Sequence, residues 1–240
     1  MAERTQLHGG EPHHRDRLAQ RLNRLRAGVL GANDGIVSVA AIGVGVAGAT
    51  SSTRTILTAG LAALVGGAIS MALGEYVSVS SQRDSERTLI AQEKAELKAD
   101  PVQELTELTQ LYQARGLSAK TARKVAEELT EHDVLSAHLE AELGIDAADV
   151  VSPWHAAGSS ALAFTLGGLL PLLAVVLIPS PVKVPMTFAI VLVALAVTGA
   201  AGARLGDSPA ARASLRVVVG GAMALAATFA IGSLLGAPAG

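Results

Sequence analysis

Charged side chains are partitioned along this 240-residue chain, and that partition limits its folds more than any other feature. Residues 27–80 and 153–240 are almost free of charge, whereas residues 1–26 and 81–150 hold nearly all of it. Only 17% of the residues are charged and the mean hydropathy is +0.42, while soluble domains are about a quarter charged. The sequence therefore predicts an all-α membrane protein with one polar insert.

Five apolar segments are long enough to cross a bilayer as helices. We expect a polar tail over 1–24, two membrane helices over 25–80, an insert over 81–150 and three membrane helices over 153–236. Nothing breaks the second helix after Ser80, so it should continue to about Lys98. The insert should contain three helices: the end of this one, a second starting at Asp100-Pro101, and a third from Ser118 to Gly144.

Charge also predicts the orientation. Residues 1–26 hold six basic and three acidic residues, and a basic collar directly precedes the first apolar segment. Such collars mark the cytoplasmic side, which places the N-terminus and the insert in the cytoplasm and the C-terminus outside. The chain shows no signal peptide or targeting signal, which fits a bacterial plasma membrane slightly better than a vacuole. His8, His13 and His14 are read as part of a solvated tail, with weak metal binding as the alternative.

Two carboxylates lie deep in the first two apolar segments. Asp34 belongs to GANDGIVS and Glu75 to SMALGEYVSVSSQRD. A charge at the bilayer centre costs at least about 2.5–3.5 kcal/mol, so such residues commonly mark ion or proton pathways. Met71 lies one helical turn before Glu75 and offers a thioether, although apolar filling is its ordinary role. We expect Asp34, Met71 and Glu75 to line a transport pathway, with a position near the membrane interface as the alternative for Glu75.

The insert is acidic, with fifteen acidic and eight basic residues over 81–150. Its candidate ligands share helix faces by their spacing and are Glu93, Glu96, Glu104, Glu107, His138 and Glu142. Carboxylates with one imidazole suit Fe²⁺ or Mn²⁺, and the chain has no cysteine for thiolate sites. Glutamates at this spacing are also common on solvated helix faces, and Lys94 and Lys98 nearby favour that alternative.

The motifs GANDGIVS and SMALGEYVSVSSQRD, with the Glu-x-x-Glu pairs that follow, resemble the vacuolar iron transporter family over about residues 22–240. The resemblance implies five membrane helices, a homodimer, a cytoplasmic three-helix metal-binding insert and proton-coupled movement of Fe²⁺ or Mn²⁺ out of the cytoplasm. It assigns Asp34 and Met71 to the membrane pathway, and Glu75 lies within the family motif. It assigns Glu93, Glu96, Glu104, Glu107 and Glu142 to the insert's metal ligands.

Two positions depart from the family pattern. His138-Leu139 stands where eukaryotic iron carriers have a Met-Met pair, and Ala63 stands where some members have a further glutamate. Without soft thioether ligands the insert favours harder ions, which increases its expected preference for Mn²⁺ relative to Fe²⁺.

The function expected is export of divalent metal by proton antiport, without a fixed cofactor, for iron and manganese homeostasis. The alternative is a membrane-anchored metal-binding or storage protein that does not transport. The sequence offers no nucleophile–base pair, no phosphate-binding glycine loop and no nucleic-acid surface, so we expect no enzyme. The expected partners are metal ions, protons, the bilayer and a second copy of the chain.

Overall fold

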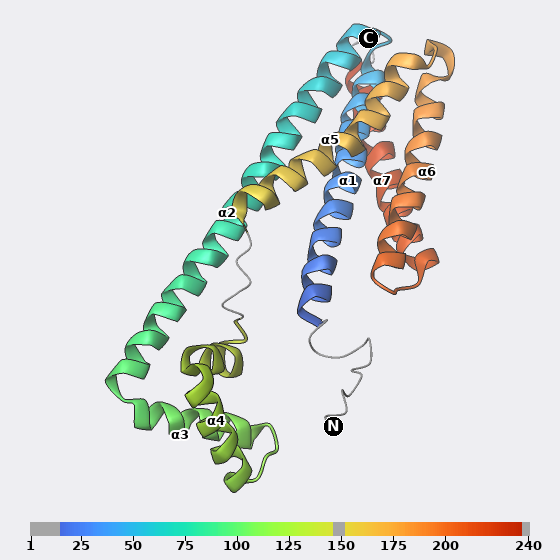
Figure 1. The fold of residues 1–240 in the computed structure, drawn as a ribbon. Helices are drawn as coiled ribbons and strands as arrows, with labels where there is room; N and C mark the ends of the chain where they lie inside the picture. The colour runs from blue at the N-terminus through green and yellow to red at the C-terminus, as the bar shows by residue number, and fades with distance from the viewer. Residues whose placement is uncertain (1–14, 146–151, 237–240) are drawn as a thin grey trace, which may run out of the picture. The chain divides into compact units, whose positions relative to one another are not determined.

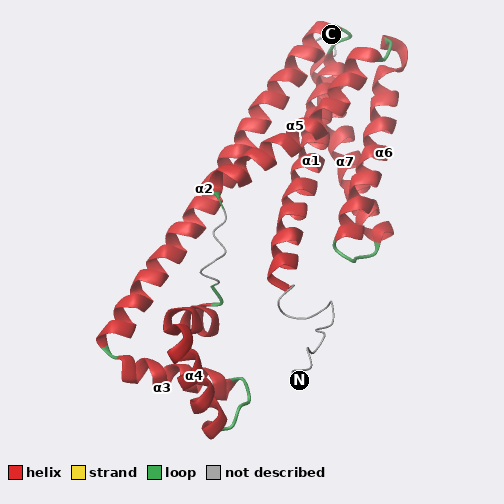
Figure 2. Ribbon diagram, in the orientation of Figure 1, coloured by secondary structure: helices red, strands yellow, loops and turns green. Residues whose placement is uncertain are grey.

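The computed structural model describes residues 15–145 and 152–236, and these residues are helical with short connections (Figures 1 and 2). The helices are α1 (Arg15–Ala49), α2 (Thr53–Ala99), α3 (Pro101–Ala114), α4 (Ala119–His138), α5 (Pro153–Leu177), α6 (Lys183–Leu205) and α7 (Ala210–Gly236). A π-helical turn, η2 (Leu139–Leu143), follows α4, and a 3₁₀ turn, η3 (Ser180–Val182), precedes α6.

Five of these helices are long and apolar enough to cross a membrane: α1 from Gly28, α2, α5, α6 and α7. This agrees with the five predicted spans. The first helix differs from its prediction, because α1 begins at Arg15 and the expected tail over 1–24 is helical from that residue on. The tail histidines His8, His13 and His14 lie outside the described residues.

The chain separates into two compact units, one of residues 1–75 with 154–240 and one of residues 76–153. In the first unit, which we call the membrane unit, α1, α6 and α7 pack against one another. Their shared core is formed by Ile36, Ala40, Val44, Val191, Leu195 and Leu225. A second core is formed by Val39, Leu64, Phe164 and Leu172 and joins α1, α2 and α5.

Glycines allow the backbones of the membrane unit to approach closely. A Cβ at Gly35 of α1 would overlap the carbonyl of Phe164 in α5, and a Cβ at Gly232 of α7 would overlap that of Gly45 in α1. Such contact is the ordinary use of small residues in membrane helices, where burial of apolar surface from water does not drive association. The glycine density of the first apolar segment therefore reflects packing.

The second unit, which we call the insert, contains the end of α2 with α3, α4 and η2. The expected caps form: Asp100 accepts a hydrogen bond from the Gln103 N–H at 3.0 Å, and Ser118 accepts one from the Thr121 N–H at 3.3 Å. The helix predicted from Ser118 to Gly144 is not continuous, because it breaks at Asp133 and ends in the π-helical turn. Leu108, Ala126, Ala137 and Ala141 form the insert's core.

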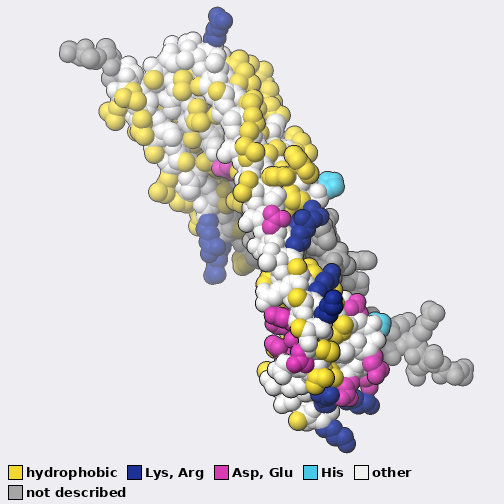
Figure 3. Space-filling model, turned by 90° about the vertical axis from the view of Figure 1, so that its left-hand side faces the viewer, with side chains coloured by type: hydrophobic (Ala, Val, Ile, Leu, Met, Phe, Trp, Pro, Cys, Tyr) yellow, Lys and Arg dark blue, Asp and Glu magenta, His cyan; other side chains and the backbone are white. Residues whose placement is uncertain are grey.

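Side chains on the surface follow the same division. Figure 3 shows hydrophobic side chains over the membrane unit, whereas acidic and basic side chains gather over the insert. Along α2, Leu61, Val65, Ile69, Leu73 and Val77 are exposed large apolar residues at four-residue spacing. An adjoining stripe of small residues at the same spacing is exposed as well: Ala62, Gly66, Ser70, Gly74 and Ser78. This face of α2 is therefore apolar and uncovered within one protomer.

Candidate functional site

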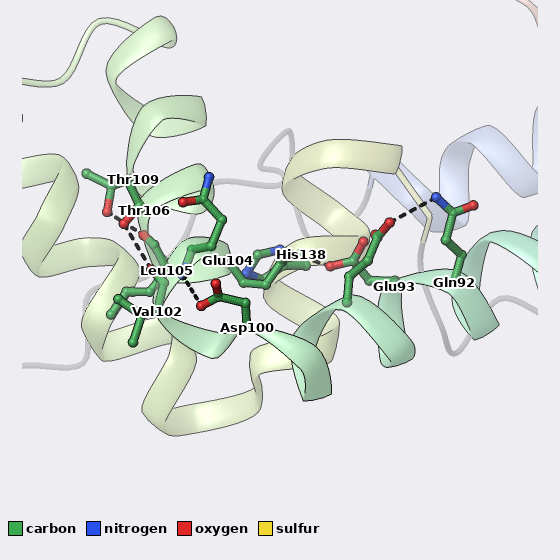
Figure 4. Close-up of polar contacts among 11 residues, drawn as sticks. Gln92, Glu93, Asp100, Val102, Glu104, Leu105, Thr106, Thr109 and His138 are labelled. Atoms are coloured by element: carbon green, nitrogen blue, oxygen red, sulfur yellow. Dashed lines mark hydrogen bonds and ion pairs between the residues drawn. The ribbon is translucent and has the colours of Figure 1, made fainter.

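Three helices of the insert bring two carboxylates and one imidazole together. Glu93 lies near the end of α2, Glu104 in the first turn of α3, and His138 at the end of α4. The tight connection between α2 and α3, where Asp100 caps the helix that begins at Pro101, sets Glu104 next to Glu93. The close-up in Figure 4 shows the His138 ring directed at Glu93.

The ligand atoms of these three residues lie within 4.8 Å of one another. His138 Nδ1 is 3.0 Å from Glu93 Oε1 and 3.7 Å from Glu104 Oε2. Ligands bound to one divalent ion at about 2.1 Å lie about 3–4 Å apart. Two oxygens and one nitrogen at these separations can therefore bind one first-row divalent ion such as Mn²⁺ or Fe²⁺ with little rearrangement.

Burial makes this arrangement unusual for a solvated helix face. His138 is 0% exposed, Glu93 3% and Glu104 8%. Glu93 Oε1 and both ring nitrogens of His138 are buried without a hydrogen bond of acceptable geometry. Buried polar atoms normally have hydrogen-bond partners, and leaving one unsatisfied costs about 1–3 kcal/mol. A cation bound between them would satisfy Glu93 Oε1 and His138 Nδ1, the ring nitrogen that faces the carboxylates.

The electrostatics of the cluster favour cation binding. Desolvation, together with the smaller effect of the charges of Glu142, Glu104, Glu96 and Glu107, raises the pKa of Glu93 to about 7. Desolvation also raises the pKa of Glu104, followed by the charges of Glu107, Glu96, Glu142 and Asp100. The negative charges of this site repel one another when it is empty, and a divalent cation would relieve that repulsion.

Desolvation lowers the pKa of His138, partly opposed by the charge of Glu107. The imidazole is therefore neutral near pH 7, which is the form that binds metals.

The other predicted ligands surround this cluster. Glu96 is exposed and accepts a hydrogen bond from Gln92 at 3.0 Å. Glu107 is half-buried and Glu142 is exposed, yet the pKa of Glu142 is raised by desolvation and by the charges of Glu107 and Glu96. In each Glu-x-x-Glu pair one member thus lies inside the cluster and the other lies farther out, a difference that equal spacing does not predict.

Two contacts that sequence reasoning missed hold the His138 segment. Asp133 caps the chain after the break in α4 by accepting a hydrogen bond from the Ser136 N–H at 3.1 Å. Arg115 donates a hydrogen bond to the Ala141 carbonyl at 2.6 Å, which fixes η2 against the end of α3. The spacing Asp-x-x-Ser is a capping signal that was available in the sequence, but it lies inside a strongly helical stretch.

In the membrane unit, Asp34 is exposed and accepts a hydrogen bond from Ser38 Oγ at 3.0 Å. Its neighbour Asn33 accepts a hydrogen bond from Thr198 Oγ1 of α6. The amide thus joins α1 to α6, while the carboxylate one residue later stays accessible. Sequence reasoning missed the role of Asn33, although a polar amide within an apolar helix is itself a signal of a helix–helix contact.

Met71 and Glu75 lie on α2. Met71 is half-buried and packs against the core of Val39, Leu64, Phe164 and Leu172, the contact expected of an apolar filler. Glu75 is partly exposed. Their roles in a pathway stay predictions.

The sequence matches the model of the VIT family over residues 25–233. It is 44% identical over 211 residues to a vacuolar iron transporter of Acanthamoeba castellanii, covering 88% of this chain and 78% of that protein. It is 35% identical over 221 residues to vacuolar iron transporter homolog 2.1 of Arabidopsis thaliana, with coverage of 92% and 85%. It is 37% identical over 215 residues to vacuolar iron transporter homolog 5 of Oryza sativa subsp. japonica, with coverage of 89% and 81%.

These relatives correct one expectation. A bacterial plasma membrane was the expected location, but the relatives are vacuolar transporters of eukaryotes. The expectation was wrong because apolar spans of this length fit bilayers of many membranes and therefore do not identify the host membrane.

The expectation that the chain is not an enzyme is confirmed, because the relatives form a family of transporters. Five apolar helices, an accessible intramembrane carboxylate and a buried carboxylate–imidazole cluster agree with that assignment. The chain belongs to the VIT family of iron transporters.

Proposed function

We propose that the chain moves Fe²⁺ or Mn²⁺ out of the cytoplasm in exchange for protons, and thereby serves iron and manganese homeostasis. The observation that carries this proposal is the buried cluster of Glu93, Glu104 and His138, whose ligand atoms lie within 4.8 Å of one another. The insert faces the cytoplasm in this proposal, as the basic residues at the start of α1 predict. It collects the ion before the membrane step.

The donor set supports Mn²⁺ beside Fe²⁺ as cargo. Two carboxylates and an imidazole are borderline to hard ligands, and no thioether belongs to the cluster. Glu96, Glu107 and Glu142 add negative charge around it and would attract a cation to the site. Once the ion is bound, their role is to complete its oxygen ligands or to hold the next ion nearby.

The membrane step is proposed to use Asp34, with Met71 and Glu75 as further pathway groups. An accessible carboxylate inside a bilayer can hold either a metal ion or a proton. Protonation of Asp34 from the far side would release the metal, and loss of that proton toward the cytoplasm would restore the site. One carboxylate with two exclusive occupants couples the two fluxes without further machinery.

The uncovered face of α2 supports a homodimer. Gly66 and Gly74 have no atom within 4 Å of an added Cβ, so the small-residue stripe is open within one protomer. Such a stripe lets a second copy of the helix approach closely. Gly66→Leu should weaken the dimer without disturbing the protomer, and cross-linking in membranes would show it. An unchanged dimer fraction would remove α2 from the interface.

Flux into proteoliposomes tests the function. Fe²⁺ and Mn²⁺ are supplied to vesicles with and without a pH gradient, and internal metal and pH are followed together. Metal uptake with opposite proton movement is expected, and the faster ion is the preferred cargo. Metal binding without flux of either ion would replace the proposal by the storage alternative.

A further inference from the structure

The helix that carries His138 changes direction shortly before it. Asp133 has an extended backbone, with φ −160° and ψ 94°, inside an otherwise helical stretch. Its carboxylate accepts hydrogen bonds from the Ser136 N–H at 3.1 Å and from the Ser136 hydroxyl at 2.8 Å. This is the geometry of a helix N-cap. A new helical segment, residues 134–143, therefore begins after Asp133.

The far end of this segment is held as well. Its last residues form the π-helical turn η2, in which the Gly144 N–H bonds to the Leu139 carbonyl. Gly144 has a φ of 63°, a left-handed conformation that terminates the helix and suits glycine. Arg115 bonds the Ala141 carbonyl at 2.6 Å. The segment is thus fixed at both ends by contacts that do not involve the metal cluster.

The break allows the segment to be buried on more than one side. Ala137, His138 and Leu139 are consecutive and are all buried. Consecutive residues of a helix point about 100° apart, so a helix lying on one surface cannot bury three in a row. Here Ala137 and Ala141 pack into the insert's core, while His138 faces Glu93 and Glu104. The segment lies between the core and the carboxylates.

We propose that Asp133 is a positioning residue for the metal cluster: by capping residues 134–143 it directs the His138 imidazole at Glu93 and Glu104. This inference rests on the proposed function, because it treats His138 as a ligand. Asp133 itself is exposed and its oxygens are engaged by Ser136, so it acts through His138 and does not bind the ion. By orienting His138, the cap gives the site a nitrogen ligand in addition to its carboxylate oxygens.

The test compares Asp133→Ala with two matched variants in the full chain. Asp133→Asn keeps a side chain that caps helices well, and Ser118→Ala removes the cap at the start of α4, far along the sequence from His138. Each protein is loaded with one equivalent of Mn²⁺. Electron spin-echo spectroscopy then detects coupling of the ion to an imidazole ¹⁴N, and titration gives the affinity.

We expect the ¹⁴N coupling in the unchanged chain, in Asp133→Asn and in Ser118→Ala. Asp133→Ala should lose most of it, with a fall in affinity of roughly tenfold, as for other groups that orient metal ligands. If Asp133→Ala does not fold, Ser136→Ala, which removes only the hydroxyl partner, should show a partial loss. Full ¹⁴N coupling in Asp133→Ala, or in Ser136→Ala if that variant replaces it, would overturn the inference. A loss of coupling in Ser118→Ala as large as the loss in Asp133→Ala would overturn it as well.

His138→Ala separates this inference from the function beneath it. Its ¹⁴N signal should vanish, because His138 is the imidazole in the cluster. A signal that persists in His138→Ala would refute His138 as a ligand, and with it this inference. A signal lost in His138→Ala but intact in Asp133→Ala would refute the positioning role alone.

Discussion

Replacing Glu93 by Gln should stabilise the empty insert and reduce the stabilisation that metal adds to it. Glutamine has the shape of a protonated glutamate but cannot ionise. The pKa of Glu93 is raised to about 7 from its ordinary 4.5, mainly by desolvation. The folded insert therefore binds this proton more tightly than the unfolded chain does, and its stability falls as the pH rises from 4.5 to about 7.

The magnitude follows from that pKa difference. One pH unit corresponds to about 1.4 kcal/mol, so ionised Glu93 destabilises the empty insert by about 3 kcal/mol above pH 7. The empty insert of Glu93→Gln should therefore be more stable than that of the unchanged chain by about 3 kcal/mol at pH 8, and by less than about 1 kcal/mol at pH 5. With metal at 100 times its dissociation constant, the unchanged chain gains about 2.7 kcal/mol, whereas Glu93→Gln, which binds metal at least tenfold more weakly, should gain at most about 1.4 kcal/mol.

Amide hydrogen exchange of the full chain measures these effects within the insert. Exchange in α3 and α4 should be roughly a hundredfold slower in metal-free Glu93→Gln than in the unchanged chain at pH 8. Metal should slow exchange more in the unchanged chain than in Glu93→Gln. Glu131→Gln, at an exposed site on α4, is the matched control. Equal or faster exchange in metal-free Glu93→Gln at pH 8 would refute the reasoning.

Three further predictions follow. Gly35→Ala should lower the yield of folded protein in size-exclusion chromatography, because its Cβ would overlap a facing carbonyl, whereas Gly66→Ala has open space and should not. Thr53→Val should lower the free energy of thermal unfolding by about 1–3 kcal/mol, because the buried Lys183 ammonium loses the hydroxyl that accepts its 2.7 Å hydrogen bond. Adding Lys183→Met should restore the stability, and a double variant as unstable as Thr53→Val would contradict this account. Mn²⁺ affinity, measured by titration, should rise between pH 4.5 and about 7, because the buried carboxyls lose their protons over this range. Above pH 7 the affinity should level off, because the lowered pKa of His138 already keeps the imidazole neutral. An affinity that does not change with pH below pH 7 would contradict this prediction.

Much of the fold was predictable because its signals are local. Apolar length predicted the five spans, and cap residues predicted the starts of α3 and α4 at Asp100 and Ser118. The start of α1 was not predictable from hydropathy, since the helix continues into charged residues from Arg15. The break at Asp133 was missed because aspartate also occurs on exposed helix faces, and only packing of the following segment decides between the two.

The site was predictable as a set of residues but not as an arrangement. Spacing selected the glutamates, yet Glu93 is 3% exposed while Glu96, on the next turn, is exposed to solvent. That difference depends on how α3 and α4 pack against α2, which no local pattern contains. His138 was included on spacing and composition, and its burial between two carboxylates depends on the break before it.

The most direct measurement of the central claim compares Mn²⁺ binding and Mn²⁺ flux in the same proteoliposomes for Asp34→Asn and Glu93→Gln. The account predicts that Asp34→Asn binds Mn²⁺ at the insert with unchanged affinity but carries no proton-coupled flux. It predicts that Glu93→Gln binds Mn²⁺ at least tenfold more weakly, as for loss of a group that a metal site depends on, and needs correspondingly more Mn²⁺ for half-maximal flux. Normal flux through Asp34→Asn would contradict the claim that the ion captured by the insert crosses the membrane at this carboxylate.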